Sequence, residues 1–434
     1  MINNYNSFIN KINFHFNKPI RTYFFFITIF VLISFVDVVG LGLIGPYVSM
    51  LVTDGNVMEE FSLKYFDLSF KENKNYFIYF LSGLLLLIFI FKSIFGITIN
   101  YLIFKFSANT KLAIRSKLLT KYLHLPYEKY LERNSSDFLN HMDLHASRCA
   151  EVIVSYLKIL SDFLIVLFIL IMLALINIYA FLFLAIIFLL FVFIYDFFLK
   201  NKIYTLGKDS ANYQQIALKN INELFGSFKE NIILNKKNYF SNYILQGFKK
   251  DAEIDIKIST LRSVPKFVLE ALIIVLSVLF VIILTTLGKN IEEFIIVISV
   301  FSVSIIRMVP LISTLTNAIG IIRFGLDGLE KTYKELNSLD YINIDEYREL
   351  DLKNFSFESL KLTNFSFKYN SKDKVIFNNA NMKIYKNDKI GISSPSGTGK
   401  TTLIDLALGL LKVNEGEFLI NDKIVNEKIL ARFR

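Results

Sequence analysis

Long apolar runs recur through the first three quarters of this chain and restrict its fold more than any other feature. A helix of about 20 apolar residues matches the roughly 30 Å of hydrocarbon in a bilayer. Six apolar windows can be drawn, at residues 23–52, 76–104, 162–176, 179–198, 264–287 and 291–315. The third and fourth belong to one nearly charge-free run, which we divide at Asn177 because it is too long for a single span. With 53% hydrophobic residues, more than a soluble domain usually carries, the chain is predicted to place six transmembrane helices in lipid.

Basic residues are concentrated in two of the segments between the predicted spans. Residues 105–161 and 199–263 are rich in Lys and Arg, whereas residues 53–75 are acidic, through Asp54, Glu59, Glu60, Asp67 and Glu72. Because Lys and Arg are retained on the cytoplasmic side, the basic segments and both termini are predicted to be cytoplasmic. Anionic lipid of the inner leaflet accounts for the formal net charge of +10, so we expect no nucleic-acid partner.

Each basic segment is too long to be a simple connector. Helical periodicity in residues 111–124 and 216–228 predicts that each segment consists of extensions of two neighbouring spans that meet at a tip. We expect the first tip at residues 126–137 and the second tip at residues 224–239. The chain can form no internal disulfide bond, because Cys149 is its only cysteine.

A candidate phosphate-binding loop lies in residues 389–411. A short apolar strand through Ile390 and Ile392 is expected to lead into the loop, and an apolar helix follows it. Such loops bind phosphate because backbone N–H groups and a helix N-terminus converge on one anion. In this pattern Lys400 reaches the outer phosphates and the Thr401 hydroxyl binds Mg²⁺. The candidate ATP ligands are Ser394, Ser396, Gly397, Thr398, Gly399, Lys400, Thr401 and Thr402.

The loop departs from the usual pattern at one position, where Ser394 replaces the first glycine. We expect its Cβ to strain the turn. Before the loop, short strands are predicted at residues 365–369, 375–377 and 382–384, and one more strand is predicted from Gly416 into a turn at Asp422. The loop is thus expected in an α/β domain.

On these motifs the whole chain resembles the ATP-binding cassette (ABC) exporters, in which six spans precede a nucleotide-binding domain. The resemblance implies a transmembrane domain in residues 1–340, a linker in residues 341–354 and a nucleotide-binding domain from residue 355. It also implies that Tyr369 stacks on adenine and that the two tips are coupling helices. The signature motif, the catalytic Glu and the switch His have no counterpart up to residue 434. We therefore expect a truncated nucleotide-binding domain and assign no catalytic residue.

Ionisable residues within predicted spans are candidates for cargo contact, because each is costly in lipid unless it meets a partner. They are Asp37, Lys92, Lys266, Glu270 and Arg307. The three cations, Lys92, Lys266 and Arg307, could bind an anionic headgroup. Alternatively, the cations pair with the two acidic residues, and Lys266 extends to the interface.

The segments around these residues resemble the lipid-linked oligosaccharide flippases of bacteria. Their motifs are Asp37 to Gly40, Val264-Pro265-Lys266, Leu269-Glu270 and Arg307-Met308-Val309-Pro310. The resemblance implies a half-transporter of the bacterial inner membrane that works as a homodimer or heterodimer and uses ATP with Mg²⁺ to flip a lipid-linked saccharide. Two alternatives stay open. One is an exporter of another lipid, a drug or a peptide, and the other is a membrane protein that binds nucleotide without hydrolysis.

Overall fold

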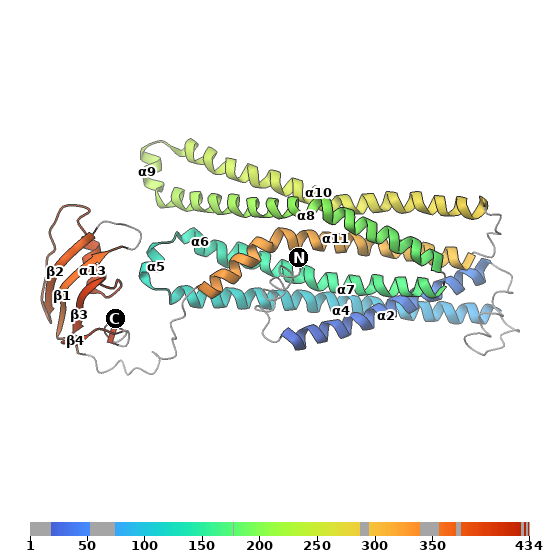
Figure 1. Ribbon diagram of the computed structural model, residues 1–434, viewed down its shortest axis with the longest axis horizontal. Coiled ribbons are helices and arrows are strands. Elements are labelled where there is room, and N and C mark those ends of the chain that lie inside the picture. The colour runs from blue at the N-terminus through green and yellow to red at the C-terminus, as the bar shows by residue number, and fades with distance from the viewer. Residues whose placement is uncertain are drawn as a thin grey trace. The chain divides into compact units, whose positions relative to one another are not determined.

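The computed structural model describes residues 19–52, 74–176, 178–286, 295–338, 356–369, 375–426, 429, 430 and 433. Each predicted apolar window falls, in its described part, within a different long helix (Figure 1). These helices are α2 (Pro19–Val52), α4 (Lys74–Leu123), α7 (Ala146–Ile176), α8 (Ile178–Gly226), α10 (Lys237–Thr286) and α11 (Ile295–Ser338). The helix boundary between α7 and α8 lies at the predicted place, with Asn177 itself outside the described residues.

Four helical segments are long and apolar enough to cross a membrane, among the residues that the structure describes. They are Phe24–Ile44, Ile78–Leu123, Ser135–Ile176 and Phe301–Ser338. The count of six spans stays a prediction. Helix α4 has 50 residues, which at 1.5 Å per residue gives about 75 Å, far more than the hydrocarbon thickness. A helix of this length is longer than a bilayer span requires.

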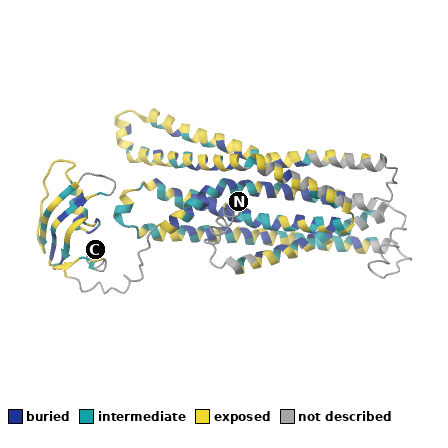
Figure 2. Ribbon diagram, viewed as in Figure 1, coloured by how far each residue is buried: buried dark blue, intermediate teal, exposed yellow. Residues whose placement is uncertain are grey.

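Short helices lie at both predicted tips. The first tip contains α5 (Tyr127–Leu131) and the start of α6 (Ser135–Asn140), which continues into the π-helix η1 (His141–His145) and α7. The second tip contains α9 (Phe228–Ile233) between α8 and α10, which run side by side in opposite directions (Figure 1). Most residues of α9 are exposed, as Figure 2 shows.

The chain divides into two compact units. We call Met1–Ser116 with Leu139–Lys334 the helical unit, and Lys117–Phe138 with Glu335–Arg434 the sheet unit. In the helical unit, an apolar core gathers side chains from α2, α7, α8, α10 and α11, including Leu41, Ile169, Phe191, Leu269 and Met308.

A buried arginine joins three helices of the helical unit outside the predicted spans. Arg148 of α7 donates hydrogen bonds to the Gly207 carbonyl at 2.8 Å and to Ser210 Oγ at 3.0 Å, both on α8. Its guanidinium lies 4.4 Å from the ring centroid of Phe324 on α11. The helices cross so closely that a Cβ on Gly207 would lie 2.4 Å from the Phe324 carbonyl oxygen. Glycine at this position is therefore a packing requirement.

The sheet unit contains an antiparallel sheet of order β2-β1-β3-β4. Its strands are β1 (Ser359–Lys368), β2 (Val375–Tyr385), β3 (Glu415–Ile420) and β4 (Lys423–Ile424). The strand predicted from Gly416 and its turn at Asp422 are confirmed. The strands predicted at residues 375–377 and 382–384 are both present as parts of one continuous strand, β2, which pairs with β1 along both stretches.

A bulge in β1 determines which residues of the strand face the core of the sheet unit. Strand side chains alternate between faces, yet Leu360, Leu362, Phe365 and Phe367 are all buried in one cluster. The register shifts between Leu362 and Phe365, where Asn364 has a φ of 46°, and this shift changes which face the following residues meet. Residues 365, 367 and 369 consequently share the face that packs on α13 (Lys400–Ala407).

The strand predicted before the loop is not present. Residues 388–395 have no strand assignment, and the side chains of Ile390 and Ile392 are 53% and 43% exposed. A strand requires a neighbour to which its backbone can bond, and none of the described strands pairs with this segment. The helix after the loop is confirmed as α13.

Candidate functional site

Two glycines shape the candidate phosphate-binding loop. Gly397 and Gly399 have φ values of +79° and +105°, which side-chain-bearing residues rarely adopt. Gly399 is also the N-cap residue of α13, and a Cβ there would lie 2.5 Å from Cγ2 of Ile376 in β2. The backbone therefore approaches the sheet at the point where the helix begins.

Hydrogen bonds hold the loop closed around the lysine. The Lys400 ammonium donates to the carbonyl oxygens of Ser394 at 2.6 Å and Pro395 at 2.8 Å. Thr398 Oγ1 donates to the Pro395 carbonyl at 2.9 Å and lies 2.6 Å from Ser394 Oγ. Residues 391–398, including Ser396, are exposed, so solvent and ligands can reach the loop.

The strain expected at Ser394 is not found. The described non-glycine residues with positive φ are Asn235, Asn364, Asn379, Asn387, Asn421 and Asp422. Ser394 therefore has a backbone conformation that ordinary residues adopt, and the prediction was wrong because the turn takes its left-handed residues at Gly397 and Gly399 instead.

Tyr369 lies beside the loop helix. Its ring packs edge-on against Phe367 at 5.0 Å between centroids, and its hydroxyl lies 3.1 Å from Oγ1 of Thr402, which is buried in α13. Thr401 is exposed at the start of the same helix. The bulge in β1 thus brings the predicted adenine-stacking residue to the phosphate loop, although the stacking itself stays a prediction.

The loop residues fit a nucleotide phosphate. Gly397 and Gly399 add no side chains to the loop, the N-terminus of α13 supplies a favourable potential for anions, and Lys400 supplies a positive charge. Nothing in the described residues assigns a general base, and the described residues hold no group of three or more His, Cys, Asp or Glu side chains that could hold a metal ion. The site as described is suited to binding phosphate.

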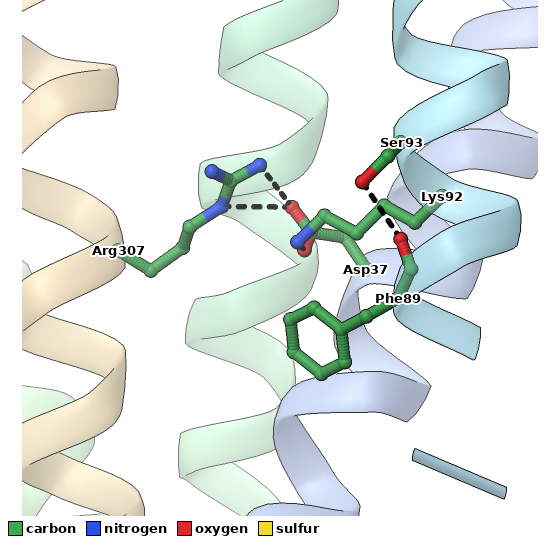
Figure 3. A network of polar contacts seen from close by, with 5 residues as sticks. All are labelled: Asp37, Phe89, Lys92, Ser93 and Arg307. Carbon is green, nitrogen blue, oxygen red and sulfur yellow. Dashed lines mark hydrogen bonds and ion pairs between the residues drawn. The ribbon is translucent and has the colours of Figure 1, made fainter. Parts of the chain in front are cut away.

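A second polar site lies among the membrane helices and unites two of the three predicted basic residues (Figure 3). Asp37 of α2, only 1% exposed, accepts hydrogen bonds from Nε and Nη2 of Arg307 on α11, at 3.0 and 2.8 Å. Lys92 of α4 forms an ion pair with the same carboxylate, and its ammonium lies 5.0 Å from the Phe89 ring centroid. Two cations thus share one carboxylate, which leaves the cluster with a net positive charge.

Lys266 is not part of this cluster. Its ammonium lies 5.8 Å from the ring centroid of Phe267, its neighbour on α10. The pairing considered for Asp37 is therefore confirmed with Lys92 and Arg307, while Lys266 meets an aromatic ring in its own helix.

One polar contact near this cluster was missed from the sequence. Thr314 of α11 donates a 2.6 Å hydrogen bond to Oδ2 of Asp162 on α7. Thr314 follows Arg307 by seven residues, two helical turns, so the two side chains lie on one face of α11. The spacing of Arg307 and Thr314 is visible in the sequence, but nothing in the sequence pairs Thr314 with Asp162, 152 positions earlier.

The protein is therefore an α-helical membrane protein whose chain also carries a candidate phosphate-binding loop in an α/β unit. Comparison with known proteins adds the family that this region resembles. Residues 377–434 match the family model for ABC transporters, so this region of the chain is similar to the ATP-binding domains of that family.

Relatives extend the same comparison. The chain is 36% identical over 89 residues to a Rickettsia typhi protein named as an export ATP-binding/permease protein, covering 20% of this chain and 16% of that protein. It is 26% identical over 214 residues to the subtilin transport ATP-binding protein SpaT of Bacillus subtilis, covering 46% of this chain and 32% of that protein. The chain covers less than two thirds of the length of each of these relatives.

Proposed function

We propose that this protein is an ATP-driven exporter that moves an amphiphilic cargo across the membrane. The observation that carries the proposal is the presence, on one chain, of long apolar helices and a phosphate-binding loop in an ABC transporter domain. ATP supplies the free energy, since its binding shifts the protein between conformations by its different affinity for each. Residues 394 and 396–402 hold the phosphates, Thr401 holds Mg²⁺, and Tyr369 holds the adenine.

The transporter works as a dimer of two such chains, identical or different, in the bacterial inner membrane with both termini in the cytoplasm. Exposed apolar residues at the second tip support a partner, because large apolar groups on a soluble surface usually mark an interaction site. Phe228, Ile232, Ile233 and Leu234 are between 48% and 70% exposed. The basic segments support the orientation.

The cargo is a lipid with an anionic headgroup, and a lipid-linked oligosaccharide is the member of that class we favour. The net positive charge of the Asp37, Lys92 and Arg307 cluster supports an anionic group. An apolar groove of about 360 Å³ supports a lipid chain. It is lined by neighbours of Asp37 and Lys92 on α2 and α4, namely Phe35, Val36, Val39, Leu87, Ile88 and Phe91.

A peptide is the second candidate cargo. The specific observation that favours it is the similarity over 214 residues to a protein named for subtilin transport. The two candidates differ in what they require of the polar cluster, because a peptide without phosphate does not need two cations held in lipid. Loss of Arg307 should therefore impair a lipid exporter more than a peptide exporter.

Photolabelling with an ATP analogue tests the nucleotide site. We expect Lys400→Ala to abolish labelling of the full chain, because the variant lacks the cation that contacts the outer phosphates. Lys383→Ala is the matched control, since Lys383 is an exposed lysine on β2 of the same unit. Labelling of Lys400→Ala at the level of Lys383→Ala would refute the site.

Stimulation of ATP hydrolysis by cargo tests the polar cluster in the full-length transporter. We expect Arg307→Ala to lose stimulation by a polyprenyl pyrophosphate while basal hydrolysis is retained, because Arg307 lies far along the sequence from the loop and in the other compact unit. An equal loss of both activities would indicate a purely structural role.

A further inference from the structure

A buried carboxylate joins three segments near the end of the last long helix. Glu335 of α11 is 6% exposed. Its Oε1 accepts a hydrogen bond from the Tyr122 hydroxyl, at 3.1 Å, and another from Nη1 of Arg133. Tyr122 lies in the last turn of α4, and Arg133 lies between α5 and α6 in the first tip. All three residues belong to the sheet unit.

A second contact lies one residue further along α11. The Lys121 ammonium donates to the backbone carbonyl of Leu336. Carbonyl groups in the last turn of a helix lack partners within that helix, so a lysine is well suited to this position. The end of α4 therefore contacts the end of α11 through two adjacent residues, 121 and 122.

Aromatic rings extend the contact into the first tip. Tyr122 packs edge-on against Phe138 at 4.8 Å between ring centroids, and Tyr130 stacks against Phe138 at 5.8 Å. Tyr127 stacks on Tyr130 at 6.2 Å. The side chain of Tyr127 also packs against the apolar cluster of the sheet. A chain of contacts thus runs from Glu335 through the tip to the sheet.

This cluster differs from the ion pairs on the surface of the same helix. Lys334 pairs with Glu330 at 3.0 Å, but these side chains are 72% and 40% exposed, so solvent screens their attraction. The side chain of Glu335 is 7% exposed, and a buried carboxylate that loses its partners is strongly disfavoured. The buried pair of Arg133 and Glu335 is therefore expected to stay formed, whereas the exposed pair of Lys334 and Glu330 can open at little cost.

We propose that Glu335 is a positioning residue that fixes the first tip to the end of α11, so that the tip and the nucleotide-binding sheet move as one body. Residue 338 ends α11, and the chain reaches β1 at residue 359, so Glu335 lies close to the point where the helices give way to the ATP-binding domain. The rigid connection is argued from these contacts alone, and its role in transport rests on the proposed function.

Distances between two spin labels test the rigid connection without any activity. One label is placed on the tip by Glu132→Cys and the other on β2 by Lys383→Cys, both at exposed positions. The natural Cys149 is fully buried and stays unlabelled in the folded full chain. Labelled chains are diluted with unlabelled ones in nanodiscs so that only distances within one chain are read.

We expect one narrow distance distribution in the parent chain and in the matched control Glu330→Gln. In Glu335→Ala the distribution should become at least about twofold wider, because the tip opens locally when its buried partner is lost. Glu335→Gln and Arg133→Met provide milder variants in case Glu335→Ala does not fold. An unchanged width in both milder variants would overturn the proposal.

A functional readout separates positioning from simple stability. In the full-length transporter we expect Glu335→Gln to keep basal ATP hydrolysis and to lose stimulation by cargo, and we expect the charge exchange Arg133→Glu with Glu335→Arg to restore it in part. Loss of both activities, with no recovery on exchange, would contradict a positioning role. If the parent protein hydrolyses no ATP but its spin-label distance distribution is narrow, the proposed function is refuted while the rigid connection is still supported.

Discussion

Removal of the Asp37 carboxylate should destabilise the helical unit more than removal of either cation that it binds. Asp37→Asn leaves Lys92 and Arg307 among apolar helices without their shared anion. Breaking a buried ion pair from one side costs about 3–5 kcal/mol. Lys92→Met is the matched control, because Asp37 then keeps both hydrogen bonds from Arg307. This variant should lose about 1.5–3 kcal/mol of unfolding free energy.

The sequence provides its own probe for this measurement. Cys149 is the only cysteine and is 0% exposed within the helical unit, so a thiol-reactive dye reports unfolding of that unit. At about 2 °C per kcal/mol for a large domain, Asp37→Asn should lower Tm by about 6–10 °C. A shift in Tm no larger than that of Lys92→Met would refute the reasoning that the one carboxylate stabilises both cations.

Three further predictions concern packing and the nucleotide site. Gly207→Ala should cost about 1–3 kcal/mol in the dye assay, because its Cβ would meet a carbonyl of α11, whereas Gly226→Ala in the same helix meets nothing within 4 Å and should cost nothing. Gly399→Ala should weaken binding of an ATP analogue, measured by photolabelling, because its φ is +105° and its Cβ would meet Ile376, while Gly391→Ala should bind normally. Tyr369→Phe should retain analogue binding, and Tyr369→Ala should lose at least about tenfold affinity if the ring stacks on adenine at 1–3 kcal/mol per base.

Local sequence was enough to predict the phosphate loop and the two tips. Gly397, Gly399 and Lys400 lie within four residues, so their arrangement depends on little else in the chain. The helical periodicity of residues 216–228 likewise led to the second tip, where α9 lies between α8 and α10. The strand through Ile390 could not be predicted in this way, because a strand exists only where another strand bonds to it.

Long-range contacts required the structure. Asp37 and Arg307 are 270 positions apart, and the sequence showed only that each is an ionisable residue in an apolar helix. Glu335 and Arg133 are 202 positions apart and outside the predicted spans, where charged residues are common and gave no signal. The bulge at Asn364 is a local feature that the sequence does indicate. The apolar residues at 360, 362, 365 and 367 break the strict alternation of a regular strand between 362 and 365.

ATP-dependent movement of a lipid tests the central claim most directly. The full-length protein would be placed in liposomes with a fluorescent polyprenyl pyrophosphate, and the fraction of lipid that changes leaflet would be followed by quenching from outside. We expect movement with ATP for the parent protein and none above protein-free liposomes for Lys400→Ala. Equal movement by the parent and by Lys400→Ala, or movement that does not depend on ATP, would contradict the account.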